Sequence, residues 1–179
     1  MKSVLISINP RWCELIASGS KTVEVRKTKP KLETPFKVYI YETQGRMETP
    51  FIDEEGHHIF KGRGQVIGEF VCNKITTAEC GNYCILTRSE TQLGGLDLLN
   101  YADEKTVYGW HISDLVIYDK PRELSEFKQV KKIRGYHKKD EPKTEGINIQ
   151  RILHSSRVEV KYFTRPPQSW CYVESEDTK

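Results

Sequence analysis

The chain has 179 residues, 37% of them hydrophobic and 30% charged, and a net charge of only +3. This length predicts one domain over residues 1–179 with a sizeable core, and no apolar stretch approaches the roughly 18 residues that a membrane span needs. Five scattered cysteines and an amino terminus without a signal-peptide pattern argue against a disulfide scaffold and a secreted protein, so we expect a cytoplasmic one.

The first thirty residues predict a strand, a helix and a second strand. Residues 3–8 are aliphatic and β-branched, as in a buried strand. Asn9 and Pro10 are typical of an N-cap and a first helical position. Apolar residues then recur at helical spacing until Gly19, which predicts the end of the helix, and the second strand follows at once.

Side chains of this second strand should alternate between two faces. Val23 and Val25 share one face, and Glu24 and Arg26 share the other. We expect the aliphatic face to lie on the interior of the protein and the ionic face to line a polar groove, with Lys21 at the entrance of the strand. The alternative is a solvated edge that carries an ordinary ion pair.

Further strands are predicted where aliphatic and aromatic residues alternate or cluster, at 35–43, 64–76, 106–121 and 158–163. Within the second of these, Gly68 indicates a bulge or a close approach of backbone. Thr77 is a candidate cap of a short helix, and the leucines at 93–99 predict another helix, interrupted by Gly94 and Gly95. Five or six strands with one or two helices predict an α+β fold, a small curved sheet or barrel. Insertions are expected at about 44–62 and 128–160.

Two basic segments favour a polyanionic partner despite the low net charge. Residues 26–31 carry four lysines and arginines, and residues 128–139 carry six and no acid. A solvated surface is the plainer explanation of such runs. If the partner is RNA, its backbone phosphates are expected to contact five side chains, namely Lys27, Lys29, Lys131, Lys132 and Arg134.

Residues 19–26, GSKTVEVR, match the G-x-K-x-x-E-x-R motif of ASCH domains, a PUA-like superfamily that the chain therefore resembles. Three further segments are similar to the same family. They are the strand and helix that precede this motif, the later strand QVIGEF, and the segment YGWHISDLVIYDKPRELSEF. The closing RPPQSWCYVE resembles phage and bacterial members. The resemblance implies a small PUA-like β-barrel of five to six strands with one or two flanking helices, RNA binding, and a cleft lined by Lys21, Glu24 and Arg26.

These three residue types suit a nucleotide-like ligand. Lys21 and Arg26 can neutralise phosphate, and Glu24 between them can accept a hydrogen bond from a base amino group. Tyr108 and His111, on a later predicted strand, are further candidates for ligand binding. We expect RNA or a nucleotide-like ligand, and neither a metal nor a cofactor. The structural alternative is an ion pair on a barrel rim.

One enzymatic alternative comes from a branch similar to this family, which removes an acyl group from a modified cytidine. That chemistry uses a lysine, a threonine three residues later, and a glutamate. Lys21 matches the lysine, but Glu24 stands where the threonine would be, and a carboxylate cannot replace a hydroxyl nucleophile in the same acyl transfer. Glu79 and Glu90 are both candidates for the remaining glutamate.

A second enzymatic alternative is metal-independent cleavage of RNA. It needs a base for the 2′-hydroxyl and cations for the developing negative charge on phosphorus. Glu24 or His111 could be the base, and Lys21 and Arg26 the cations. A third alternative, from a different class, is a protein-interaction module whose basic segments contact an acidic partner.

Overall fold

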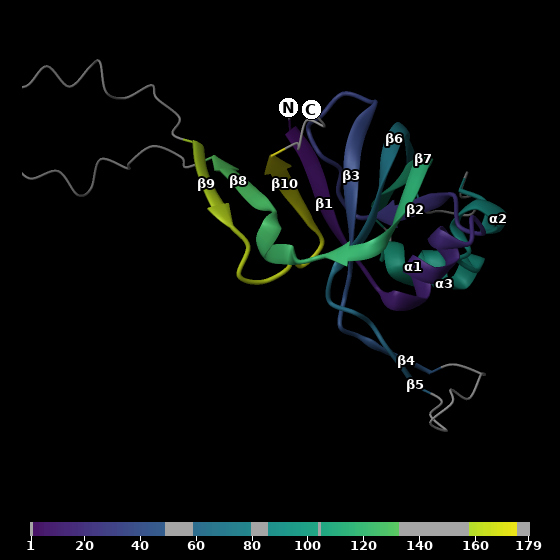
Figure 1. The fold of residues 1–179 in the computed structure, drawn as a ribbon. Helices are drawn as coiled ribbons and strands as arrows, with labels where there is room; N and C mark the ends of the chain where they lie inside the picture. The colour runs from purple at the N-terminus through teal and green to yellow at the C-terminus, as the bar shows by residue number, and fades with distance from the viewer. Residues whose placement is uncertain (1, 49–58, 80–85, 104, 133–157, 175–179) are drawn as a thin grey trace, which may run out of the picture.

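The computed structural model of the chain describes residues 2–48, 59–79, 86–103, 105–132 and 158–174. The main sheet is formed by eight strands: β1 (Lys2–Ile8), β2 (Val23–Arg26), β3 (Phe36–Glu42), β6 (Val66–Glu79), β7 (Thr106–Arg122), β8 (Lys128–Lys132), β9 (Val158–Tyr162) and β10 (Trp170–Glu174). Their order is β2-β7-β6-β3-β1-β10-β8-β9, so β2 and β9 are the outer strands and the described sheet is not closed (Figure 1). The predicted α+β class is confirmed.

Three helices lie on one side of this sheet, near β2: α1 (Pro10–Ala17), α2 (Arg88–Thr91) and α3 (Gly95–Ala102) (Figure 1). In the part of the chain that the structure describes, none of the helices has the length and apolar character needed to cross a membrane. A separate antiparallel hairpin, β4 (Arg46–Glu48) with β5 (Ile59–Lys61), projects from the predicted insertion. A short 3₁₀ helix, Leu124–Glu126, precedes β8.

The first strand, helix and second strand form as the sequence predicts. Asn9 caps α1 by accepting a hydrogen bond from the backbone nitrogen of Arg11 at 3.1 Å, and Pro10 is the first helical residue. Gly19, just beyond the helix, has a φ of +73°, a conformation that side chains with a Cβ rarely adopt. The chain can therefore turn sharply from α1 into β2.

The main core lies between the sheet and α1 and includes β1, β3, β6 and Trp110 of β7. A second cluster, with Tyr39 and Phe127, contains side chains from β1, β3 and the carboxyl-terminal strands. The aliphatic residues of β2 belong to neither. Val23 and Val25 pack instead in a third cluster with α3 and the adjoining ends of β6 and β7.

This placement corrects one prediction about β2. The alternation of its two faces is as expected, but the aliphatic face covers the small third cluster and not the main core. Glu24 is paired with Trp110 on β7, and directly paired residues of antiparallel strands project to the same side. The ionic face therefore lies on the side of the main core, because the helices supply a separate apolar surface for Val23 and Val25.

Two helix predictions were wrong. Thr77 does not cap a helix, because β6 continues through it to Glu79 and Thr77 pairs with Tyr108. The pair Gly94–Gly95 does not interrupt a helix, because α3 begins at Gly95. The strand β10 was not predicted, and it pairs antiparallel with β1.

Gly68 lies at a register shift between β6 and β7, which confirms the predicted close approach. A Cβ atom placed there would lie 2.4 Å from the carbonyl oxygen of Val116, a backbone atom that cannot move aside alone. We expect Gly68→Ala to lower the free energy of unfolding by about 1–3 kcal/mol, as overpacking does. Urea denaturation measures this change.

Gly95→Ala is the matched control, because a Cβ there meets nothing within 4 Å and its φ is ordinary. It should leave stability unchanged or raise it by roughly 0.4–1 kcal/mol. Equal effects of the two substitutions would show that the close approach at Gly68 is not a constraint on the sheet.

Candidate functional site

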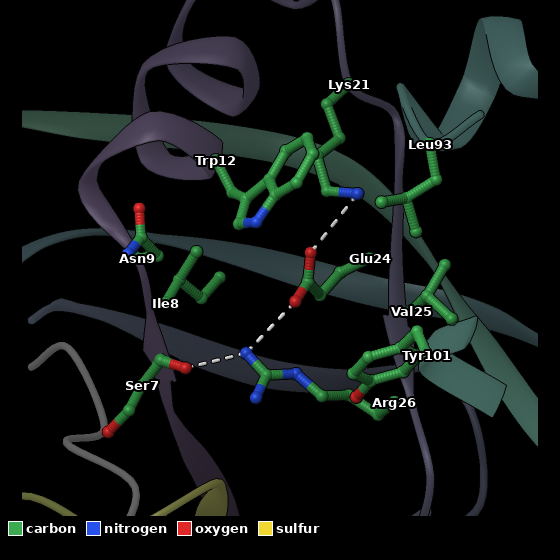
Figure 2. Close-up of a pocket in the computed structure, with 10 residues that line it drawn as sticks. All are labelled: Ser7, Ile8, Asn9, Trp12, Lys21, Glu24, Val25, Arg26, Leu93 and Tyr101. Atoms are coloured by element: carbon green, nitrogen blue, oxygen red, sulfur yellow. Dashed lines mark hydrogen bonds and ion pairs between the residues drawn. The ribbon is translucent and has the colours of Figure 1, made fainter. Parts of the chain in front are cut away.

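The motif residues Lys21, Glu24 and Arg26 form one ion network beside α1 (Figure 2). Glu24 Oε2 lies 3.4 Å from Lys21 Nζ, and Glu24 Oε1 lies 3.0 Å from Arg26 Nη2. The three side chains are nearly buried, with exposed fractions of 2%, 7% and 11% for Lys21, Glu24 and Arg26. The network therefore holds two cations on one carboxylate in a largely desolvated place.

Each cation of the network also donates to a backbone carbonyl from another part of the chain. Lys21 Nζ donates to the carbonyl oxygen of Thr91, the last residue of α2, at 2.6 Å. Arg26 Nη2 donates to the carbonyl oxygen of Ser7, near the end of β1, at 2.6 Å. The network thus connects β2 to α2 and to β1 through charge-assisted hydrogen bonds, which are stronger than neutral ones.

A pocket of about 200 Å³ opens beside the ion network (Figure 2). Its lining comes from the end of β1, from α1, β2 and α3, and from the turn between α2 and α3. Besides the three ionic residues, it includes the apolar or aromatic side chains of Ile8, Trp12, Val25, Leu93 and Tyr101. The site therefore combines two aromatic rings with a carboxylate and two cations.

One donor of the network finds no acceptor in the part of the chain that the structure describes. Arg26 Nε is buried and has no hydrogen-bond partner among the described residues. A buried donor left unpaired costs about 1–3 kcal/mol. Arg26 lines the pocket, but this nitrogen is itself buried, so an acceptor atom of a bound molecule would remove that cost only where the side chains beside it move to admit the acceptor.

Burial also affects the acid–base behaviour of Lys21. Desolvation lowers the pKa of its ammonium group, and the charge of Glu24 opposes this shift in part. The ring of Trp12 lies 5.1 Å from Lys21 Nζ, close enough for a cation–π contact. The amine is thus closer to its neutral form than that of a solvated lysine.

Tyr108 and His111 do not line the pocket, although they were predicted to bind the ligand. Tyr108 is paired with Arg26 across β2 and β7, so it lies next to the pocket residues. His111 is paired with Val23, and its Nε2 lies 2.8 Å from Thr76 Oγ1. Burial lowers the pKa of His111 below its ordinary value. The structure separates His111 from the ion network, and its role in binding stays a prediction.

The predicted backbone contacts fall in two regions. Lys27 and Lys29 are exposed and follow β2 directly, beside the pocket. Lys131 and Lys132 belong to β8, which is separated from β2 by five strands of the sheet. The side chains of these two lysines, and the whole of Arg134, are not among the parts that the structure describes. Contacts of these five residues with RNA stay predictions.

Glu24 is the one carboxylate among the described residues that line the pocket. Glu90 accepts a hydrogen bond from Thr87 at 2.5 Å, and Glu79 ends β6. Thr22, which follows Lys21 in sequence, is exposed and is not a pocket residue. Among the described residues that line the pocket, Lys21 is joined by neither a threonine nor a second glutamate, which the acyl-transfer alternative uses.

In the described ranges, no group of three or more His, Cys, Asp or Glu side chains could hold a metal ion. Cys72 is buried in the main core, and Cys80 and Cys84 lie outside the described residues. The polar groups that the described residues bring to the pocket include an amine, a guanidinium, a carboxylate, the hydroxyl groups of Ser7 and Tyr101, and the amide of Asn9.

The sequence analysis predicted three of the ten residues that line the pocket, and those that it missed include Trp12, Leu93 and Tyr101. Trp12 follows the helical apolar pattern of α1, which predicts only that it packs on the core. It does pack there in part, and its ring also borders the pocket. Leu93 and Tyr101 carry no comparable signal, because their place depends on how α2 and α3 dock against β2.

Glu24→Gln should lower the free energy of unfolding by about 3–5 kcal/mol, because two nearly buried cations lose their shared anion. Urea denaturation at neutral pH measures the loss. Asp103→Asn is the matched control, since its ion pair with Lys105 has exposed fractions of 66% and 71% and should matter little. A loss for Glu24→Gln as small as that for the control would contradict a structural role of the network.

The lowered pKa of Lys21 predicts a pH dependence. Between its folded pKa and the ordinary value of 10.5, the unfolded chain binds more protons than the folded protein. The contribution of Lys21 to stability should therefore rise with pH in that window and be least favourable below the folded pKa. The free energy of unfolding of the wild type minus that of Lys21→Met should increase as the pH is raised toward 10.5. A constant difference would count against the shift.

Neither a protein-family model nor a curated protein matches the sequence. Solved structures of ASCH from Zymomonas mobilis do match. The ASCH structure itself has a TM-score of 0.52 and 18% identity, and the match covers 97% of this chain and 89% of that chain. A serine-to-alanine variant of that protein matches with a TM-score of 0.56 and 18% identity, with the same coverage of both chains. A tyrosine-to-phenylalanine variant matches with a TM-score of 0.50 and 20% identity, covering 69% of this chain and 77% of that chain. This chain therefore has the fold of the solved ASCH structures, as the resemblance at residues 19–26 implied.

Proposed function

We propose that this protein binds RNA, or a nucleotide-like ligand, by taking a base into the pocket beside Lys21, Glu24 and Arg26. The observation that carries the proposal is a buried donor, Arg26 Nε, that has no acceptor among the described residues and belongs to a side chain that lines the pocket. The same pocket presents a carboxylate and two aromatic rings. A heteroaromatic base carries acceptor atoms, amino groups and a flat apolar face on one rigid body. Each of these finds a counterpart in the pocket.

The pocket residues can be assigned separate roles toward such a base. Arg26 Nε donates to a ring nitrogen or carbonyl oxygen of the base, and Glu24 accepts from an exocyclic amino group through lone pairs that its cations leave free. Trp12 and Tyr101 offer ring faces for stacking. Lys21 and Arg26 hold Glu24 in place and add a net positive charge.

The size of the pocket supports a single base. Its volume of about 200 Å³ lies below the roughly 300–1,000 Å³ of sites that enclose drug-sized ligands. A base can enter, while the ribose and phosphate of the same nucleotide remain at the mouth. There the exposed lysines that follow β2 are close in sequence and in space to the pocket residue Arg26.

An enzyme acting on RNA or a modified nucleoside is the second candidate function, and one observation favours it. The pKa of Lys21 is lowered by burial, and an amine nearer its neutral form is a better base or nucleophile than a solvated lysine. Lys21 and Glu24 would then be the catalytic pair. Turnover of RNA or of an acylated cytidine that Lys21→Met abolishes in a folded protein would establish this second function in place of binding alone.

Tyr101→Ala tests the aromatic wall of the pocket. Stacking of a base on an aromatic ring is worth about 1–3 kcal/mol, so affinity for short single-stranded RNA should fall roughly fivefold to 160-fold. Tyr101 is 37% exposed, so its replacement should not endanger folding. Isothermal titration calorimetry measures the affinity.

Two variants control this test. Tyr101→Phe keeps the ring and should retain most of the affinity. Tyr162→Ala removes a tyrosine on β9 that is 62% exposed and lies outside the pocket, and it should have no effect. Equal affinity of Tyr101→Ala and the wild type would exclude stacking on this ring, and absence of any RNA binding by the wild type would overturn the proposal.

A further inference from the structure

The segment Lys27–Lys31, KTKPK, leaves β2 immediately after the pocket residue Arg26. Its three lysines, Lys27, Lys29 and Lys31, are exposed, while Pro30 is buried. None of the three lysines takes part in an ion pair within the described portion of the chain. Positive charge thus continues from the pocket onto the surface. No carboxylate among the described residues forms an ion pair with these three lysines.

This segment is held in place by two aromatic side chains of β10. Trp170 Nε1, on β10, donates to Thr28 Oγ1 at 2.9 Å. The backbone nitrogen of Lys31 donates to the hydroxyl oxygen of Tyr172 at 2.7 Å. One bond holds the side chain of Thr28 and the other holds the backbone of Lys31, so the segment is tethered on both sides of Lys29. Binding a partner along it therefore loses little conformational entropy.

Two of the lysines lie over aromatic rings. Lys27 Nζ is 5.3 Å from the ring centroid of Tyr101 on α3, and Lys29 Nζ is 5.2 Å from that of Tyr108 on β7. Tyr101 lines the pocket, and Tyr108 is the cross-strand neighbour of Arg26. Cations and rings therefore alternate from the pocket outward, which is the pattern that single-stranded nucleic acids favour.

The acidic surroundings are limited. Asp103, beside α3, is paired with Lys105 at 2.9 Å, and the pKa of Asp103 is held below its ordinary value first by Lys105 and then by the charge of Lys27. An acidic peptide would use the lysines but leave the rings of Tyr101 and Tyr108 without a flat partner. A chain of nucleotides uses both, because phosphates alternate with bases.

We infer that Lys27–Lys31 is a phosphate track for single-stranded RNA, and that the pocket takes one base of that strand. The inference rests on the proposed function and narrows it, because it makes the ligand a polymer and not a free nucleoside. The strand is single because one base can enter the pocket, and a neighbouring base can lie on Tyr108, only when both have left a duplex stack. Lys27 and Lys29 contact the phosphates that flank the base in the pocket.

The test compares two kinds of probe: the four ribonucleoside 5′-monophosphates, and single-stranded octaribonucleotides of the same bases. The wild type should bind the best octamer more tightly than the matching monophosphate, with the advantage falling as salt is raised. In the double variant Lys27→Gln/Lys29→Gln, the slope of log affinity for the octamer against log salt concentration should become shallower by about 0.7 per lysine. We define the octamer advantage as the ratio of octamer affinity to monophosphate affinity. Between about 1 M and 0.1 M salt, this ratio should rise about fivefold less per lysine removed, or about 25-fold less in all, than it does in the wild type.

The matched control is Lys74→Gln/Lys120→Gln, which removes the same charge from exposed lysines of β6 and β7 and should keep the octamer advantage. Monophosphate binding with no octamer advantage, or an advantage that both double variants lose equally, would overturn the track and leave the pocket standing. Equal competition by poly-glutamate would overturn it in favour of a general anion surface. Failure of the wild type to bind any monophosphate or octamer would overturn the proposed function itself.

Discussion

The burial of Glu24 between two cations is the constraint on which this side of the protein depends. Removing ions from water costs several kcal/mol per ion, and the cost is offset only when every partner is in place. Glu24 needs Lys21 and Arg26, and these cations in turn need the carbonyl groups of Thr91 and Ser7. The end of β1, the end of α2 and all of β2 must therefore dock together, and the pocket is the space that their docking leaves beside α1 and α3.

This arrangement separates the tasks of the charged residues. The ion pair that was considered as a structural alternative is present, but it is buried and not on a solvated rim. Most donors of Lys21 and Arg26 are used inside the protein, so the proposed function assigns ligand binding to Arg26 Nε, the remaining lone pairs of Glu24 and the aromatic walls. The same proposal assigns attraction of a polyanion to lysines such as Lys27 and Lys29, which are exposed.

Local chemistry made much of this predictable. Asn9 and Pro10 predict the start of α1, the alternation in β2 groups Glu24 with Arg26, and the motif predicts both the fold and the cluster of Lys21, Glu24 and Arg26. What could not be predicted depends on contacts distant in sequence. The side on which Glu24 lies is decided by the apolar cluster that α3 provides for Val23 and Val25, and the pocket wall at Tyr101 is decided by the docking of that helix.

The most direct measurement of the central claim is the NMR signal of the Arg26 Nε–H group during titration with single-stranded RNA, assigned by its loss in Arg26→Lys. In the free protein this donor has no acceptor among the described residues, so its proton should be poorly deshielded. The account predicts a marked downfield shift as a base acceptor engages it, together with a shift of the Trp12 indole signal. Saturating RNA that moves other resonances but leaves Arg26 Nε–H and Trp12 unchanged would show that the ligand binds elsewhere and that the buried network is structural only.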